Sequence, residues 1–453
     1  MVFLDMVKLM KLLLFNNRIY IYIKKGDQQL KKPYIVVHPL HSNFDEEIEI
    51  SVKGCNPSDE ISILTYIHDD RDECFVSDAT FIANKNGEVL IANEASIKGT
   101  YTGIDRNGIF WSAKHEKKKH DDYFLKNNIS SLTIKMQLKI RDELVHEVTF
   151  ERSFYKNDIH VVELNQNHII GTLYLPKEKG DYPNVLLLAG SDGGKLDPAA
   201  SLLAAKGYNV LDLAYFNQDG VPKDLENIPL EYFYKAVQFL KEQTNNRSKV
   251  IVIGYSKGAE LALLLASEYD EFSAVIAGAP SAYTTSGMRN GIFAPIPSWT
   301  KNAQAKSFLK MQHKFSNMLP VLKQMILKRP VSFFNVWEDS LKKDNNRLED
   351  ARIKVENIKA PVLLISGDKD GIWPSSTFSN EIKSKLDSIE HLQFKEGGHF
   401  VSFPYALPHL PANVYEHLGG RTIMDCGGTK EANANAAIQS WNYIQNFIKK
   451  HSE

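Results

Sequence analysis

The sequence is poor in cysteine, and the few cysteines that it has form no pattern. Its 453 residues include three, Cys55, Cys74 and Cys426, with no C-x-x-C spacing between them. Three scattered thiols exclude a disulfide framework and indicate a reducing compartment, so we expect a cytoplasmic protein. None of the three lies in a nucleophile motif, which also argues against a catalytic cysteine.

Net charge is lacking too. The formal charge is −1, from 54 basic and 55 acidic residues, which excludes the broad basic surface of a nucleic-acid-binding protein. The hydrophobic fraction of 43% and the charged fraction of 24% are those of an ordinary globular chain. Nothing in the sequence implies a cofactor or a metal, and we expect none.

The amino-terminal residues are apolar but form no membrane-spanning run. Asp5, Lys8 and Lys11 interrupt the apolar stretch, and no small-residue cleavage site follows it. We therefore expect residues 1–34 to be a leader or extension that need not be ordered, and we expect no stable insertion into a membrane.

Residues 35–158 have the two-residue period of half-buried strands. Apolar and polar residues alternate over 48–52 and again over 132–140. Asn86-Gly87 stands between two apolar segments and predicts a hairpin, because both residues tolerate a positive φ. Several short strands over this length predict an immunoglobulin-like β-sandwich domain.

From residue 159 to residue 453, short apolar runs alternate with helix-length amphipathic segments. This rhythm predicts a mostly parallel sheet covered by helices, an α/β fold. The expected strands are 169–175, 184–189, 209–213, 250–253, 274–277, 362–366 and 392–395. The expected helices are 198–205, 230–241, 257–268, 377–386 and 432–449. Residues 282–357 do not fit the rhythm, and we expect an insertion there over the carboxyl end of the sheet, where such folds bind ligands.

A G-x-S-x-G motif joins one expected strand to the next helix. It reads Gly254-Tyr255-Ser256-Lys257-Gly258, with a β-branched run before it and an Ala/Leu-rich segment after it. Such a turn strains the serine backbone, so the flanking positions must lack bulky side chains. Ser256 then stands clear as a nucleophile, and the Lys257 amide can stabilise an oxyanion. A serine in an ordinary strand–helix turn is the alternative interpretation.

A serine nucleophile needs a base and an orienting acid, which in α/β-hydrolases follow in the order serine, acid, histidine. The strand 362–366 leads into G-D-K-D, where Asp370 is the expected acid and Asp368 its rival. His399, in the glycine-flexed loop E-G-G-H-F, is the expected base. The sequence thus predicts an α/β-hydrolase fold with a triad of Ser256, Asp370 and His399.

The second oxyanion donor is expected in the loop after the strand 184–189. That loop reads G-S-D-G-G over residues 190–194, and its small residues let backbone amides approach a substrate. The donor is the amide of Ser191 or of Asp192. A phosphate-binding loop is the competing interpretation, but the G-K-[ST] ending is missing.

Motifs in both halves resemble one known family. They include G-I-D-R-N-G-I-F-W-S in the first half and S-K-G-A-E, D-K-D-G-I-W and G-G-H-F in the second, in order over residues 40–450. The family is that of the acyl-CoA thioesterases related to bile acid-CoA:amino acid N-acyltransferase. The resemblance implies a serine hydrolase that cleaves acyl-CoA thioesters, with the triad above and a sandwich that helps to shape the acyl-CoA site.

Three positions bear on that resemblance. The acyltransferase branch typically carries cysteine where this chain has Ser256, which favours water over an amine as the acyl acceptor. Lys369 separates the two aspartates that the family has as a pair. Trp373, three residues after Asp370, matches the family's loop and supports Asp370 as the acid.

Other functions stay open from the sequence. The alternatives are an esterase or amidase acting on another acyl compound, an acyl-CoA:amino acid N-acyltransferase, and a catalytically silent binding module. The expected partner is a small-molecule acyl-CoA, and the expected state is a monomer or small homo-oligomer. Apolar residues at helical spacing between Phe308 and Leu319 could cover an acyl chain or form a packed helix. Lys117–Lys119 could meet nucleotide phosphates or be a solvated loop.

Overall fold

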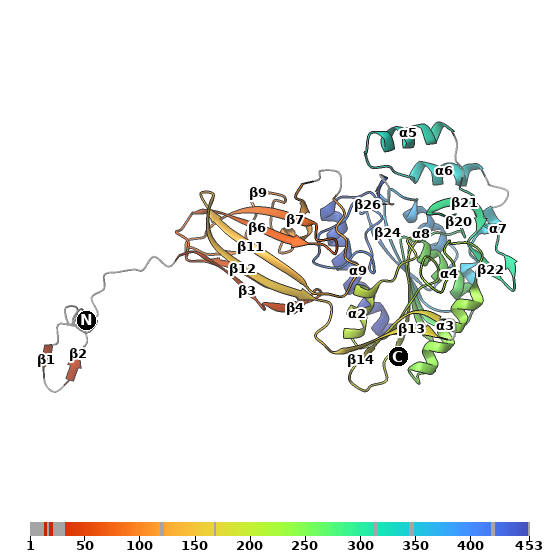
Figure 1. Cartoon of the computed structure of the whole chain (residues 1–453), viewed down its shortest axis with the longest axis horizontal. Helices are drawn as coiled ribbons and strands as arrows, with labels where there is room; N and C mark the ends of the chain where they lie inside the picture. The colour runs from red at the N-terminus through yellow and green to blue at the C-terminus, as the bar shows by residue number, and fades with distance from the viewer. Residues whose placement is uncertain are drawn as a thin grey trace.

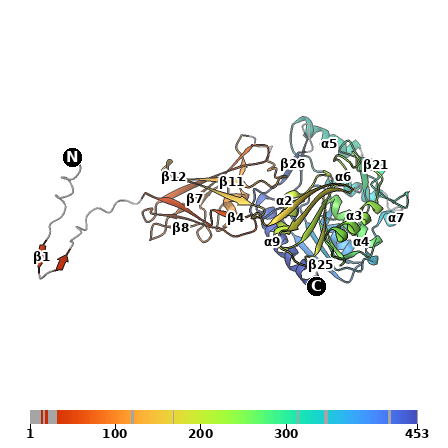
Figure 2. The same cartoon turned by 60° about the horizontal axis from the view of Figure 1, so that its bottom comes forward.

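The computed structural model describes residues 13–15, 18–20, 32–117, 122–166, 169–311, 315–343, 348–417 and 422–451. Most of the predicted leader, 1–34, lies outside these residues, as do Lys118 and Lys119; within the leader, β1 (Leu13–Phe15) pairs with β2 (Arg18–Tyr20). The rest of the described chain forms two bodies side by side, one of strands and one of strands and helices (Figures 1 and 2).

The first body is a sandwich of two sheets. The larger sheet has the strand order β10-β7-β6-β11-β12-β4, with β9 paired to β7, and the smaller sheet has the order β3-β5-β8. The bounds are β3 (Tyr34–His38), β4 (His41–Asn43), β5 (Glu49–Lys53), β6 (Glu60–His68), β7 (Cys74–Ile82), β8 (Val89–Leu90), β9 (Lys98–Gly99), β10 (Lys114–His115), β11 (Leu132–Ile140) and β12 (Glu143–Ser153), with the short helix α1 (Gly108–Trp111). Burial alternates along β6 and β11, and side chains of both sheets share one apolar core.

The hairpin predicted at Asn86-Gly87 is wrong. β7 pairs with β6 in the larger sheet, whereas β8 pairs with β5 in the smaller one. The turn itself is present, since Gly87 has a φ of +73° and its amide donates to the Asn84 carbonyl at 2.9 Å. Apolar segments on both sides of a turn are expected in a hairpin within one sheet, but they are equally expected where the chain crosses between two sheets that share one core. The second case holds here.

The second body is built on an eight-stranded sheet with the order β13-β14-β16-β15-β18-β19-β24-β25. The bounds are β13 (Ile159–Gln166), β14 (Ile169–Pro176), β15 (Asn184–Leu188), β16 (Asn209–Leu213), β18 (Val250–Tyr255), β19 (Phe272–Gly278), β24 (Val362–Gly367) and β25 (Ile389–Phe394). β14 runs antiparallel to β13 and to β16, and all pairs from β16 to β25 are parallel. This is the α/β-hydrolase fold that the sequence predicts, with β13 added before the first strand that periodicity identifies.

Helices cover both faces of this sheet, which is why its central strands read as unbroken apolar runs. The bounds are α2 (Asp197–Ala205), α3 (Leu230–Gln243), α4 (Lys257–Glu268), α8 (Ser375–Lys383) and α9 (Lys430–His451). Along β15, Val185 and Leu187 belong to the core with α2 and α9, whereas Leu186 belongs to the core with α3 and α4. The first of these two cores also contains the sandwich residues, so one apolar core runs through both bodies.

The segment 282–357, predicted as an insertion, contains short strands and helices at one end of the second body (Figure 1). The bounds are β20 (Ser286–Arg289), β21 (Ile292–Pro297), β22 (Trp299–Lys301), β23 (Gln304–Ala305), α5 (Phe315–Ile326), α6 (Phe334–Lys343), α7 (Leu348–Ala351) and a 3-10 turn (Val355–Asn357); β17 (Ile228–Pro229) pairs with β22, and β26 (Tyr415–His417) with β27 (Ile423–Asp425). Phe308 and Met311 precede α5, so the predicted spacing does not form one helix. Within the described residues, no helix is both long and apolar enough to cross a membrane.

Candidate active site

A strained turn holds Ser256 between β18 and α4. Its φ of 53° and ψ of −115° lie outside the usual regions for a residue with a side chain. A Cβ on Gly254 would lie 2.0 Å from the carbonyl oxygen of Gly258, and a Cβ on Gly258 would lie 2.3 Å from that of Ala189. Both glycines are therefore required by close backbone approach, as the motif predicts.

A chain of hydrogen bonds joins the three predicted triad residues. The Ser256 Oγ lies 3.0 Å from His399 Nε2, and His399 Nδ1 lies 2.8 Å from Asp370 Oδ2. All three side chains are buried, at 7%, 4% and 4% exposure. In this arrangement His399 can accept the proton of the Ser256 hydroxyl while Asp370 holds the imidazole in the required tautomer.

The structure separates the two candidate acids. Asp370 Oδ1 accepts from the amides of Ile372 and Trp373 at 2.9 and 3.2 Å, and its Oδ2 accepts from the Ser375 hydroxyl at 2.7 Å. Asp368 is exposed, and its carboxylate accepts a hydrogen bond from an amide side chain on β25 at 2.6 Å. Only Asp370 is in contact with His399.

Two backbone amides at the cavity of the nucleophile are candidates for an oxyanion site. Ser191 and Lys257 both line the same cavity as Ser256, and neither amide has an acceptor among the described residues. The Gly190 amide of the same loop is occupied, because it donates to the Tyr405 hydroxyl at 2.9 Å. Ser191, one of the two predicted loop donors, therefore has an amide without an acceptor among the described residues and stays a candidate for the second oxyanion donor.

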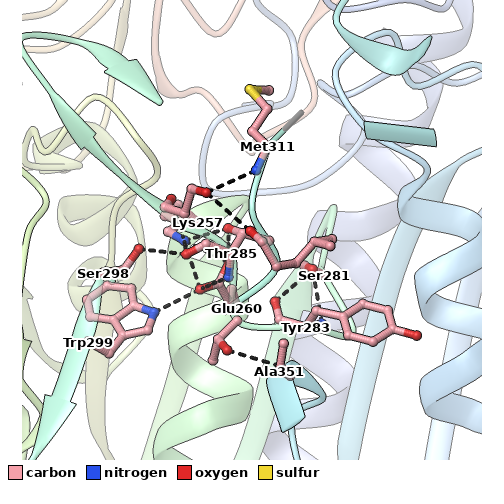
Figure 3. A network of polar contacts seen from close by, with 12 residues as sticks. Lys257, Glu260, Ser281, Tyr283, Thr285, Ser298, Trp299, Met311 and Ala351 are labelled. Atoms are coloured by element: carbon pink, nitrogen blue, oxygen red, sulfur yellow. Dashed lines mark hydrogen bonds and ion pairs between the residues drawn. The ribbon is translucent and has the colours of Figure 1, made fainter. Parts of the chain in front are cut away.

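The side chain of Lys257 lies in a buried network of polar contacts (Figure 3). Its ammonium group donates to both carboxylate oxygens of Glu260 at 2.8 and 2.9 Å and to Thr285 Oγ1 at 2.5 Å. Glu260 also accepts from the Trp299 indole at 2.8 Å and from the Thr285 hydroxyl at 2.6 Å. Burial lowers the pKa of Lys257, and the charge of Glu260 opposes that shift.

This network ties the amino-terminal end of α4 to the inserted segment. The Ser298 hydroxyl donates to the Thr285 carbonyl at 2.9 Å, and the Met311 amide donates to the Ser286 hydroxyl at 3.1 Å. Met311 itself lines the cavity. The residue that follows the nucleophile is thus anchored to the same segment that forms the cavity wall.

A cavity of about 440 Å³ opens in front of Ser256 and His399. Its wall is mainly apolar and includes side chains of the insertion and of the loops after β24 and β25. Among them are Met288, Phe293, Val321, Trp337, Trp373 and Met424. A second cavity of about 250 Å³ lies between the two bodies and shares Asp192, Phe400, Tyr405 and Glu416 with the first.

Sequence patterns give no sign of a second acidic group beside the triad. Glu416, on β26, lines both cavities; burial and the charge of Asp192 raise its pKa to about 7, with His399 acting in the opposite direction. Burial also raises the pKa of Asp192, whose carboxylate accepts a hydrogen bond from the Tyr405 hydroxyl. An acid on a three-residue strand outside the main sheet has no periodic or motif signal, so only the fold reveals its place.

The sheet order and the strand–turn–helix at Ser256 define an α/β hydrolase with an amino-terminal β-sandwich. The chain belongs to the family of acyl-CoA thioester hydrolases and bile acid-CoA acyltransferases. The model "Acyl-CoA thioester hydrolase/BAAT N-terminal region" matches residues 45–166, and the model "BAAT / Acyl-CoA thioester hydrolase C terminal" matches residues 228–453.

Curated relatives resemble the chain over most of its length. The rat acyl-coenzyme A thioesterase 1 is 26% identical, with 90% of this chain and 94% of that protein covered. The mouse mitochondrial acyl-coenzyme A thioesterase 2 is also 26% identical, with 90% and 87% covered. Among solved structures, an esterase of Pyrococcus furiosus matches at 16% identity and a TM-score of 0.37, covering 65% of this chain and 91% of that one.

Proposed function

We propose that this protein hydrolyses acyl-CoA thioesters to a free acid and CoA, with Ser256, His399 and Asp370 as its catalytic residues. The observation that carries the proposal is a Ser256–His399–Asp370 hydrogen-bond chain whose Ser256 and His399 line an apolar cavity of about 440 Å³. The names of the relatives supply the substrate class. The apolar wall suits a fatty acyl chain, since burying such a chain releases water from both surfaces.

The reaction has two halves. Ser256 attacks the thioester carbonyl as His399 takes the hydroxyl proton, and the resulting oxyanion lies between the amides of Lys257 and Ser191. The CoA thiolate leaves, and because a thiolate is a stable anion near neutral pH it needs little protonation. His399 then activates a water molecule, which attacks the acyl-enzyme and releases the acid.

Water is the proposed acceptor rather than an amino acid. Water attacks the acyl ester on Ser256 with His399 as base, and the acyl group leaves as the free acid. The chain also lacks, at position 256, the cysteine that is typical of the acyltransferase branch. Two properties stay predictions from the sequence: the localisation, which we expect to be cytoplasmic, and the oligomeric state, which we expect to be a monomer or a small homo-oligomer.

The test offers acyl-CoAs of several chain lengths to the purified protein and follows thiol release with a chromogenic reagent, alongside p-nitrophenyl esters. We expect thiol release that saturates with acyl-CoA concentration. Ester cleavage without thiol release would contradict a thioesterase. An amide product on addition of glycine or taurine, detected by mass, would instead assign acyl transfer.

A matched pair of serine variants tests the proposed roles. Ser256→Ala removes the nucleophile and should lower kcat by at least about 10⁴-fold. Ser191→Ala keeps its backbone amide, so it should retain near wild-type kcat although it lies at the same cavity. Equal losses in the two variants would contradict these assignments.

A further inference from the structure

The outer face of α5 exposes an unusual number of large apolar side chains. Leu319, Leu322 and Ile326 are 50%, 53% and 72% exposed and lie at i, i+3 and i+7, on one stripe of the helix. Leu327, just after the helix, is 48% exposed. Both views place α5 outside α6, at the edge of the molecule (Figures 1 and 2).

An adjoining face of α5 belongs to the active site. Val321 is buried and Met325 is 38% exposed, and both line the cavity that contains Ser256. The helix is therefore a wall with two apolar surfaces, one toward the proposed acyl cavity and one toward the outside. A surface helix of an isolated globular protein normally has a polar outer face, so the outer stripe calls for a partner.

The charges on α5 and on residues 327–329 have one sign. Residues 272–337 contain no Asp or Glu, although the whole chain has a net charge of −1. Lys323, Lys328 and Arg329 are exposed beside the apolar stripe, and no carboxylate in the described part of the chain pairs with any of them. The surface thus combines exposed apolar side chains with unpaired cations.

We propose that α5 and residues 327–329 dock onto the surface of an anionic lipid bilayer. An amphipathic helix with cations beside an apolar stripe lies in the plane of such a surface, with the stripe among the acyl chains and the cations at the headgroups. A helix of 12 residues is too short to span a bilayer, so the contact is interfacial.

Charge distinguishes this partner from a second copy of the chain. Two copies meeting through α5 would bring the cations of both together, and neither α5 nor residues 327–329 contain an acid to neutralise them. Anionic headgroups supply that neutralisation. Docking also places the wall of the acyl cavity at the lipid surface, where amphiphilic acyl-CoA collects; this consequence rests on the proposed function, whereas the docking does not.

The test measures sedimentation of the full chain with lipid vesicles, with no substrate present. The vesicles contain phosphatidylcholine alone or phosphatidylcholine with about 30% phosphatidylserine. We expect at least about tenfold tighter binding to the anionic vesicles, weakened by salt. Measuring without substrate separates a failure of docking from a failure of the thioesterase proposal.

Two independent variants and one control complete the test. Leu322→Asp with Ile326→Asp, and separately Lys323→Glu with Lys328→Glu, should each lose at least about tenfold in vesicle binding. Leu144→Asp, at an equally exposed leucine of the sandwich, should bind as wild type. Hydrolysis of a soluble short-chain acyl-CoA should be unchanged in all three, since none of these residues lines the cavity.

Some results would overturn the proposal. They are absence of wild-type binding to anionic vesicles, equal binding to neutral ones, and equal loss in the Leu144→Asp control. Self-association that depends on Leu322 and Ile326, seen by analytical ultracentrifugation, would assign the face to a second copy instead. The lysine variant leaves apolar packing untouched, so it decides the matter even where the aspartate variant fails to fold.

Discussion

Two aspartates two positions apart, Asp368 and Asp370, have unlike surroundings. Asp370 receives four hydrogen bonds, one of them from His399, whereas Asp368 faces solvent. Asp370→Asn should lower kcat by about 10⁴-fold, because an amide in that place disfavours the tautomer that lets Nε2 accept the serine proton. Asp368→Asn should leave kcat near wild type. Thiol-release kinetics on both variants shows which aspartate is the acid of the triad. A larger loss of kcat in Asp368→Asn than in Asp370→Asn would contradict Asp370.

Glu416 should make the fold less stable at alkaline pH. Its pKa in the folded protein is about 7, raised from 4.5 by burial first and by Asp192 second. A raised carboxyl pKa means that the folded state favours the proton, so stability falls as pH rises from about 4.5 to 7 and the loss is complete above that. A shift of this size corresponds to about 3 kcal/mol.

Glu416→Gln removes that titration. The variant should melt at a higher temperature than wild type at pH 8 and at nearly the same temperature at pH 5, where most of the penalty is absent. Glu396→Gln, at an exposed glutamate, is the control and should shift neither melt. A Glu416→Gln effect that is equal at both pH values would contradict the linkage.

At the scale of the element, the Lys257–Glu260 pair holds the beginning of α4 against the insertion. Both side chains are fully buried, so removing one leaves the other as an unpaired charge. Glu260→Leu should therefore cost about 3–5 kcal/mol of unfolding free energy. The double variant Lys257→Met with Glu260→Leu should recover most of that loss, because it leaves no buried charge.

Urea unfolding of the two single variants and the double variant measures the coupling directly. Activity per folded molecule is the second readout. If the network also fixes the Lys257 amide, the double variant regains stability while its kcat stays below wild type with an unchanged KM. Single variants within about 1 kcal/mol of wild type would contradict a buried ion pair.

Sequence periodicity predicted most elements of the hydrolase sheet because their causes are local. The run over β18, the turn at Ser256 and the start of α4 follow from residue type and spacing alone. The predicted hairpin at Asn86-Gly87 is wrong because strands distant in the sequence, β5 and β6, determine that β7 and β8 pair in different sheets. The place of Glu416 and the composition of the cavity wall cannot be predicted from the sequence for the same reason, since segments that are far apart in the sequence form both.

At the scale of the whole molecule, polar contacts reinforce the apolar core shared by the two bodies. The Lys430 ammonium, on α9, lies 3.1 Å from the Asp122 carboxylate and donates to the Ala113 carbonyl at 2.8 Å. Asn413 exchanges hydrogen bonds with the backbone of Phe124 at 2.8 and 3.0 Å. Sandwich and hydrolase sheet are thus joined by partly buried groups from α9 and from the loop after β25.

We therefore expect the two bodies to unfold together, in one calorimetric transition whose van't Hoff and calorimetric enthalpies agree. Lys430→Met removes the cation but leaves Asp122 buried without its partner, which weakens the contact between the bodies rather than either sheet. That variant should unfold in two resolved steps or show a van't Hoff enthalpy below the calorimetric one. Adding Asp122→Asn removes the stranded charge and should restore the single transition. Two steps in the wild-type protein would mean that the shared core does not couple the bodies, because a core that spans both must be lost by both at once.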